Sequence, residues 1–138
     1  MPFSDRYELI GEAPPVDAYV ALRTDAGLSP KTREQGVAAI AGTWFFCHVR
    51  DRSTGEVVAM GRVIGDGGWY FHIADIATPP AHQGRGLGRT VMETLIARIR
   101  SAAPAQPYIT LLADPPGRRL YEQFGFVSTD PTVGMRLP

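Results

Sequence analysis

Residues 82–89 restrict the fold of this chain most, because three glycines at alternate positions lead directly into an amphipathic helix. Glycines have no side chain, so three of them so close together let other groups approach the main chain closely. Before this glycine segment, residues 69–78 are rich in aromatic and β-branched side chains, which predicts a strand that ends at Pro79 and Pro80. After it, a helix that ends before Pro104 is predicted by an apolar stripe of Leu87, Val91, Leu95 and Ile99.

A helix that begins directly behind a glycine turn offers a site for an anion. The first N–H groups of a helix have no partner within it and carry a partial positive charge. Phosphates are often bound in this way, and Arg85 and Arg89 could add charge-assisted hydrogen bonds. Glycines at this spacing also occur in ordinary flexible loops, so the segment alone leaves phosphate binding open.

The glycine spacing argues against two common nucleotide loops. The loop of nucleotide hydrolases needs Lys-Ser or Lys-Thr after its last glycine, whereas Gly88 is followed by Arg89 and Thr90. The dinucleotide loop needs a longer spacing before its last glycine and an acidic residue about 20 positions later, and the sequence has neither. The remaining pattern, Gln83-x-x-Gly86-x-Gly88, resembles the acetyl-coenzyme A pyrophosphate loop of the GNAT superfamily of N-acetyltransferases.

Residues 120–126, Leu-Tyr-Glu-Gln-Phe-Gly-Phe, resemble the second signature of that superfamily, a short helix that ends in an aromatic-Gly-aromatic turn. Gly125 suits the left-handed position after a helix, and Phe126 is expected to start the next strand. The resemblance runs from about residue 56 to the carboxyl end, with both signatures in the family's order. It implies one N-acetyltransferase domain over residues 1–138, of α/β class, with a mixed, mostly antiparallel sheet of about six to seven strands and about four helices.

Composition fits one globular domain and argues against several other classes of protein. A chain of 138 residues has the size of one domain, and 44% hydrophobic with 20% charged residues is typical of globular proteins. Fourteen basic and fourteen acidic residues cancel, so no nucleic-acid or membrane partner is expected. The single cysteine, Cys47, excludes a disulfide framework and favours a cytoplasmic location. No membrane span, leader segment or metal site is expected, and a homodimer stays open.

Short strands and helices account for the rest of the chain. Ser29 and Pro30 are expected to begin the second helix, as its N-cap and first residue. An Asp-Gly pair at residues 66–67 predicts a tight turn between two strands. The expected helices besides those already described are residues 16–25 and 31–41, and the expected strands are residues 6–10, 43–50, 56–64, 69–78, 108–113, 126–128 and 133–137.

The resemblance implies which residues hold the acetyl donor, acetyl-coenzyme A (acetyl-CoA). Main-chain N–H groups of the glycine segment would bind its pyrophosphate, and the main chain at the end of strand 69–78 would bind its pantetheine arm. Asp114 stands where many relatives have an asparagine, and a carboxylate cannot donate the hydrogen bond that an amide donates. The implied carrier residues are Ile76, Ala77, Thr78, Gln83, Gly84, Arg85, Gly86, Leu87, Gly88, Arg89 and Asp114.

Tyr121 stands where the family often keeps the acid that protonates the departing thiolate. A phenol with a pKa of about 10 is neutral at pH 7 and can give its proton to a thiolate. A tyrosine on a helix can also simply pack and make one hydrogen bond. The catalytic role is the favoured interpretation, because the surrounding signature matches closely.

Two residues of strand 69–78 are alternative candidates for the group that acts on the amine. Family members often place a side-chain base six residues before the last position of this strand, which here is His72. An imidazole with a pKa of about 6.5 suits the removal of an ammonium proton. Asp75 is the alternative, as a contact to substrate or water or as a structural acceptor. In a regular strand, residues 72, 74, 76 and 78 share one face and Asp75 lies on the other, unless a bulge intervenes.

The acceptor is the part that the sequence constrains least. In this family it enters near the first two helices, which suggests Leu28, Ser29 and Trp44 as lining residues. The expected acceptor is a small primary amine of arylalkylamine or amino acid type, which attacks in a ternary complex. An N-terminal or lysine amine of a protein is the alternative acceptor. A CoA-binding regulatory module without catalysis also stays open, whereas the missing Lys-Ser or Lys-Thr argues against phosphoryl transfer.

Overall fold

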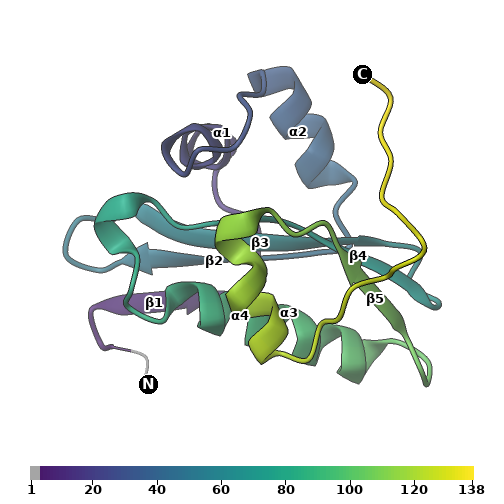
Figure 1. The fold of residues 1–138 in the computed structure, drawn as a ribbon. Helices are drawn as coiled ribbons and strands as arrows, with labels where there is room; N and C mark the ends of the chain where they lie inside the picture. Colours follow the sequence, from purple (N-terminus) through teal and green to yellow (C-terminus); the bar gives the residue numbers. More distant parts are fainter. Residues whose placement is uncertain (1–3) are drawn as a thin grey trace.

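The computed structural model describes residues 4–138 and consists of one open sheet with helices on both faces (Figure 1). Helices α1 (Val16–Asp25) and α2 (Arg33–Ala41) lie above the sheet in Figure 1, and α3 (Leu87–Ala102) lies below it. The short helix α4 (Arg118–Gln123) lies beside α3. In the described part of the chain, every helix is too short or too polar to cross a membrane.

The sheet has five strands in the order β1-β2-β3-β4-β5. The first four pair antiparallel, and β5 pairs parallel with β4 because α3 carries the chain back across the sheet. The Asp66 carboxylate accepts hydrogen bonds from the main-chain N–H groups of residues 68–70 and so holds the predicted turn between β3 and β4. The strands are β1 (Tyr7–Ile10), β2 (Phe45–Asp51), β3 (Val57–Gly65), β4 (Tyr70–Ala77) and β5 (Tyr108–Leu111).

Two apolar clusters hold the helices on the sheet. The larger cluster lies between the sheet and α3, where Phe71 and Val91 are fully buried. A Cβ on Gly61 would lie 2.6 Å from both Ile76 and Val91, so only glycine allows α3 to pack this closely. The smaller cluster, beneath α1, consists of Tyr19, Leu22, Phe46, Met60 and Ala77. Strand β4, which carries His72, Asp75, Ile76 and Ala77 of the predicted site, is therefore packed on both faces.

The α/β class and the four α-helices agree with the prediction, but the sheet is smaller than the expected six to seven strands. The strands expected at residues 126–128 and 133–137 do not form in the described chain. Phe126 packs against the core, whereas Val127 and Met135 are 86% and 92% exposed. A strand needs a neighbouring ladder for its N–H and C=O groups, and the ladder ends at β5.

The start of α2 also differs from the prediction that Ser29 caps it. Thr32 is the N-cap: its hydroxyl accepts the N–H of Gln35 at 3.1 Å, and the side chain of Gln35 accepts the N–H of Thr32 at 2.9 Å. This capping box satisfies two terminal N–H groups at once, while Ser29 instead binds the side chain of Arg23. The other elements that form agree with the predicted ranges to within two residues.

Candidate functional site

The glycine segment leaves open space beside the start of α3. Gly84 and Gly86 have φ angles of 76° and 78°, in the left-handed region that favours glycine. A Cβ on either would meet no atom within 4 Å, so the backbone conformation, not crowding, requires glycine there. Helix α3 begins at Leu87, and no side chain caps its first N–H groups. The segment therefore presents uncapped helix N–H groups next to open space, an arrangement that suits an oxyanion.

Two side chains of the segment connect it to neighbouring elements. The side-chain amide of Gln83 donates to the carbonyl of Thr78 at 3.0 Å, which joins the segment to the end of β4. Arg89 donates to the side-chain oxygen of Gln123, and its guanidinium lies 5.2 Å from the centre of the Phe124 ring. Arg89 thus joins α3 to α4. The exposed Arg85 is the arginine of this segment that is available to a phosphate.

Strand β4 continues beyond the end of β5 and carries one extra residue there. The register with β3 shifts next to the Met60–Ala77 pair, and the extra residue is at Asp75, whose φ is 56°. Pairing with β5 ends at Ile73, although β4 continues to Ala77. Within residues 4–138, no strand pairs with the β5 side of Ile76 and Ala77. That is the main-chain stretch expected to bind the pantetheine arm.

The bulge corrects the predicted arrangement of side chains on β4. A regular strand would place His72 and Ile76 on one face and Asp75 on the other. Instead, Ile76 packs into the cluster on the α3 side, and Asp75 points toward α1. Phe71 and Ile73 are both buried on the α3 side, so His72 between them faces α1 as well. The two acid–base candidates therefore share a face of the sheet.

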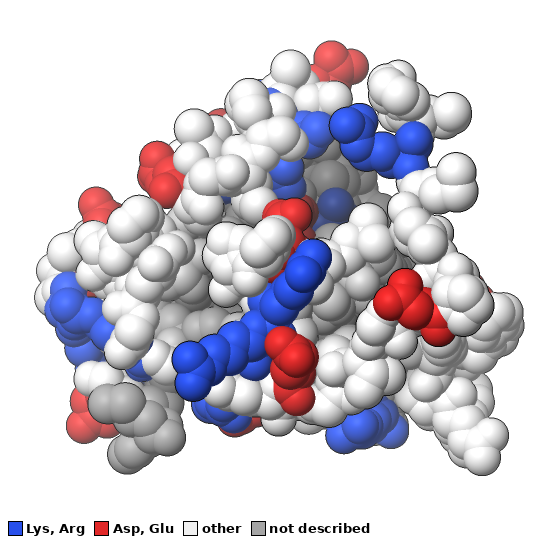
Figure 2. Space-filling view, viewed as in Figure 1, with Lys and Arg blue, Asp and Glu red and all other residues white. Residues whose placement is uncertain are grey.

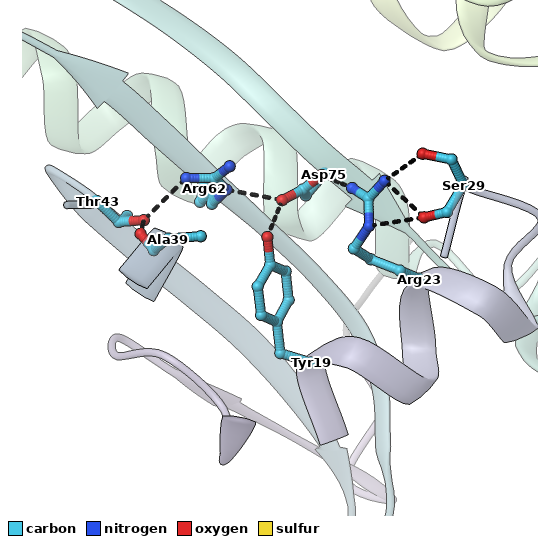
Figure 3. Close-up of polar contacts among 7 residues, drawn as sticks. All are labelled: Tyr19, Arg23, Ser29, Ala39, Thr43, Arg62 and Asp75. Atoms are coloured by element: carbon cyan, nitrogen blue, oxygen red, sulfur yellow. Dashed lines mark hydrogen bonds and ion pairs between the residues drawn. The ribbon is translucent and has the colours of Figure 1, made fainter. Parts of the chain in front are cut away.

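Asp75 is the centre of a buried polar network (Figure 3). Its Oδ2 accepts hydrogen bonds from the Tyr19 hydroxyl at 2.5 Å and from Arg62 Nε at 2.7 Å, and its Oδ1 pairs with Arg23. Burial opposes ionisation, but the hydrogen bonds from Tyr19 and Arg62 and the charges of both arginines outweigh it and lower the pKa of Asp75. Burial and the neighbouring carboxylate raise the pKa of Tyr19 to about 12. The chain itself thus supplies the partners that a buried carboxylate needs.

The sequence interpretation did not include Tyr19, Arg23 or Arg62 in the site. Tyr19 and Arg23 are one helical turn apart on α1, and both are buried. Arg62 is the only charged residue in β3, which is otherwise apolar. A lone charge in each of two adjacent strands, Arg62 and Asp75, is a signal from which this ion pair could have been predicted.

Tyr121 is held in place by the end of α4. The N–H of Phe126 donates to the carbonyl of Tyr121 at 3.2 Å, and the N–H of Gly125 donates to the carbonyl of Glu122 at 3.0 Å. With Gly125 at φ 92°, these two bonds form a Schellman motif, as the predicted left-handed glycine requires. The rings of Tyr121 and Phe126 lie 6.4 Å apart and add the apolar contact typical of this motif.

The phenol of Tyr121 is half-buried and remains protonated. Burial raises its pKa, and the negative charge of Asp114 raises it further. The Tyr121 hydroxyl oxygen lies 3.0 Å from the position that a Cβ on Gly117 would take, so glycine there leaves room for the phenol. A neutral tyrosine keeps the proton that a general acid must donate.

His72 is oriented by Thr110, its neighbour on β5. Nδ1 of His72 lies 2.9 Å from the Thr110 hydroxyl, which donates to the carbonyl of Phe71 at 3.4 Å. With its hydrogen on that carbonyl, the hydroxyl accepts the Nδ1 proton, which leaves the Nε2 lone pair free. Burial and the charge of Arg62 lower the pKa of His72. The imidazole is therefore a neutral proton acceptor at pH 7.

Two of the three residues predicted to line the acceptor site lie together. Leu28 packs against the cluster beneath α1, and Ser29 accepts hydrogen bonds from Arg23 with its carbonyl at 2.9 Å and its hydroxyl at 3.1 Å. Trp44 instead packs edge-to-face on Phe71, with ring centres 4.9 Å apart, in the cluster on the α3 side. The structure therefore does not bring Trp44 together with the other two.

A cavity of about 230 Å³ lies between α1 and α2, next to the Asp75 network. A larger open groove, of about 860 Å³, lies on another side of α1, and its lining contains none of the predicted carrier, catalytic or acceptor residues. The smaller cavity is the one that adjoins the bulge of β4. It is lined by Tyr19, Arg23, Lys31, Gln35, Gly36, Ala39 and Arg62.

Comparison with known sequences identifies related proteins. The profile of the Acetyltransferase (GNAT) family matches residues 16–126. The chain is 39% identical over 74 residues to Serotonin N-acetyltransferase 2, chloroplastic, of Oryza sativa subsp. japonica, a match that covers 54% of this chain and 36% of the rice protein. The chain spans less than half the length of the curated relatives it matches.

Solved structures give longer matches. A Staphylococcus aureus protein of unknown function, described as a probable acetyltransferase, is 37% identical, with a TM-score of 0.89 over 96% of this chain and 98% of that one. A predicted acetyltransferase from Clostridium acetobutylicum, solved with acetyl-CoA, shares the fold at 16% identity, with a TM-score of 0.71 over 94% and 96% of the two chains. The family match spans every candidate residue described above.

Proposed function

This chain belongs to the GNAT family of acetyltransferases, and on that premise we propose that it transfers the acetyl group of acetyl-CoA to the primary amine of a small molecule. The family and the acyltransferase class agree with the prediction from the sequence. The proposed acceptor is an arylalkylamine or an amino acid, which attacks directly while both substrates are bound. The observation that carries the proposal is the open space beside Gly84, Gly86 and the uncapped start of α3.

The residues at this end of the sheet fit the acetyl donor. Main-chain N–H groups at the start of α3, together with Arg85, would hold the pyrophosphate. The main chain of β4 beyond Ile73 would pair with the amides of the pantetheine arm, in place of a neighbouring strand. Acetyl-CoA supplies the acetyl group as a thioester, and these contacts would hold it beside the end of β4.

His72 and Tyr121 would move the two protons of the reaction. Nε2 of His72 accepts a proton from the ammonium group, directly or through water, so that the neutral amine can attack. As the C–N bond forms and the C–S bond breaks, the Tyr121 hydroxyl donates its proton to the departing sulfur. The neutral imidazole and the neutral phenol are the protonation states that these roles need at pH 7.

Replacing Gly86 with alanine is expected to weaken acetyl-CoA binding about tenfold or more, because the new Cβ enters the open space beside the helix N–H groups. The left-handed φ of 78° should also make the variant less stable, by about 1–2 kcal/mol. Calorimetric titration measures the first effect and thermal unfolding the second.

Gly55→Ala is the matched control, because Gly55 has a φ of 77°, also meets no atom within 4 Å, and lies in the turn between β2 and β3. It should lose similar stability and keep its affinity for acetyl-CoA. Equal losses of affinity in the two variants would contradict the assignment of the loop.

The pH profile of kcat/KM is expected to have its acidic limb below about pH 6.5. The usual pKa of an imidazole is about 6.5, and the pKa of His72 is lowered from that value. Activity needs the neutral base, so it should fall as the pH drops through that pKa. His72→Asn keeps a donor for Thr110 and removes the base, which should lower kcat/KM about 100-fold and abolish the limb.

His48→Asn is the control for this variant, since the His48 side chain binds only the carbonyl of Glu12 within residues 4–138. An unchanged limb in His72→Asn would exclude His72 as the base.

A further inference from the structure

The cavity between α1 and α2 carries an excess of positive charge. Arg23, Lys31 and Arg62 line it, and Asp75 is the carboxylate bound to the two arginines. Three cations against one carboxylate leave two positive charges without a partner. Figure 2 shows basic side chains around a hollow beneath the upper helices, with an acidic side chain at its lower edge.

Arg62 lines this cavity and has hydrogen-bond donors that no group of the described chain accepts. Its Nε donates to Asp75 and its Nη1 to the Thr43 hydroxyl at 3.1 Å, and no group in residues 4–138 accepts from Nη2. The side chain is only 15% exposed. Every fully buried side-chain nitrogen and oxygen of the described chain has a partner, so Nη2 must reach accessible space, and Arg62 lines the cavity. Arg23, in contrast, bonds through all three of its nitrogens.

The other polar groups at the cavity are donors as well. Lys31 is exposed and takes part in no ion pair of the described residues. The side-chain oxygen of Gln35 is used by the capping box, which leaves its NH₂ group as a donor. The Tyr19 hydroxyl donates to Asp75. The cavity thus offers N–H groups and positive charge, and the one carboxylate near it is already paired.

Arg62 connects the cavity to the part of β4 at which acetyl transfer is proposed. Arg62 pairs across the sheet with Ala74, directly before the bulge at Asp75. The charge of Arg62 also acts on His72, the proposed base. A group held by Arg62 would therefore place its neighbouring atoms beside the main chain of β4, where the thioester is expected.

We propose that the acceptor amine carries an anionic group, a carboxylate or a phosphate, which Arg62 and Lys31 bind in this cavity. The inference rests on the proposed acetyl transfer and narrows its acceptor to amines that carry an anionic group, of which an amino acid is one. Guanidinium and ammonium groups form strong charge-assisted hydrogen bonds with such oxyanions. A neutral arylalkylamine would leave the free donors of Arg62 and Lys31 without a partner.

Paired substrates that differ in the anionic group test this proposal. Phenylalanine is compared with 2-phenylethylamine, and phosphoethanolamine with ethanolamine, so that the two pairs distinguish a carboxylate from a phosphate. In at least one pair, kcat/KM is expected to be about tenfold or more higher for the anionic member. Lys31→Met should bring that ratio toward one, mainly through KM. Arg33→Met is the control, because exposed Arg33 pairs with Asp17 outside the cavity and should leave the ratio unchanged.

A carboxylate without an amine separates this proposal from the proposed function. 3-Phenylpropionate should compete with the amine and not with acetyl-CoA, and its calorimetric binding should be lost in Lys31→Met. Equal turnover of neutral and anionic amines would overturn the anion site and leave acetyl transfer intact. Binding of 3-phenylpropionate that depends on Lys31, without turnover of any amine, would support the anion site and overturn acetyl transfer.

Discussion

Replacing Tyr121 with phenylalanine is expected to lower kcat about 100-fold or more, because the departing thiolate loses its proton donor. Packing should persist, since the Schellman motif and the contact with Phe126 need the ring and the main chain but not the hydroxyl. Affinity for acetyl-CoA and the melting temperature should therefore change little. Steady-state kinetics, calorimetry and thermal unfolding of the purified protein measure the three quantities.

Two further variants make the Tyr121 result specific. Tyr108→Phe removes a hydroxyl from a tyrosine that is 47% exposed on β5 and should leave kcat unchanged. Gly117→Ala places a Cβ 2.8 Å from the Tyr121 ring, so it should displace the phenol and lower kcat while the hydroxyl is still present. An unchanged kcat in Tyr121→Phe would show that the proton comes from elsewhere.

Replacing Asp75 with asparagine is expected to lower the free energy of unfolding by about 3–5 kcal/mol, because removal of one partner leaves buried charges uncompensated. The side chains of Asp75, Arg23 and Arg62 are only 7%, 11% and 15% exposed. Asparagine has the same size and tolerates the left-handed φ of 56°, so the substitution removes the charge and one hydrogen-bond acceptor while the shape of the side chain is kept. Urea denaturation at pH 7 measures the change.

Asp17→Asn is the matched control for the Asp75 variant. It breaks an ion pair with Arg33 in which the side chains are 80% and 67% exposed, and such pairs contribute less than about 1 kcal/mol. The pKa of Asp75 is lowered by folding, so its stabilising effect is present above about pH 4 and is lost as the pH falls through the folded-state pKa. The difference between wild type and Asp75→Asn should shrink accordingly. A loss at pH 7 no larger than that of Asp17→Asn would contradict the role of Asp75 in the network.

The parts of the site that depend on local sequence could be predicted. The left-handed conformation of Gly125 follows from backbone sterics, because few other residues adopt these angles at low cost. The strand before the glycines and the helix after them follow from side-chain periodicity. The family that the comparisons identify was indicated by the resemblance of residues 83–88 and 120–126 to its two signatures.

The parts that depend on distant contacts could not be predicted. The lone charges of Arg62 and Asp75 on adjacent strands suggest their ion pair, but the bulge at Asp75 is also stabilised by Tyr19 and Arg23, and no local pattern specifies that these residues of α1 meet Asp75. The side chains around residues 126–137 suggest strands, but a strand forms only where a partner edge is available. Contacts between elements, rather than local propensity, decide which face Asp75 occupies and where the sheet ends.

Release of free thiol from acetyl-CoA, measured with and without a panel of primary amines, tests the account most directly. Acetyl transfer predicts thiol release that requires an amine, with one acetylated amine formed for each thiol released. Tight binding of acetyl-CoA without thiol release for any small amine would contradict it, and the chain would then be a carrier-binding module or an enzyme for protein amines.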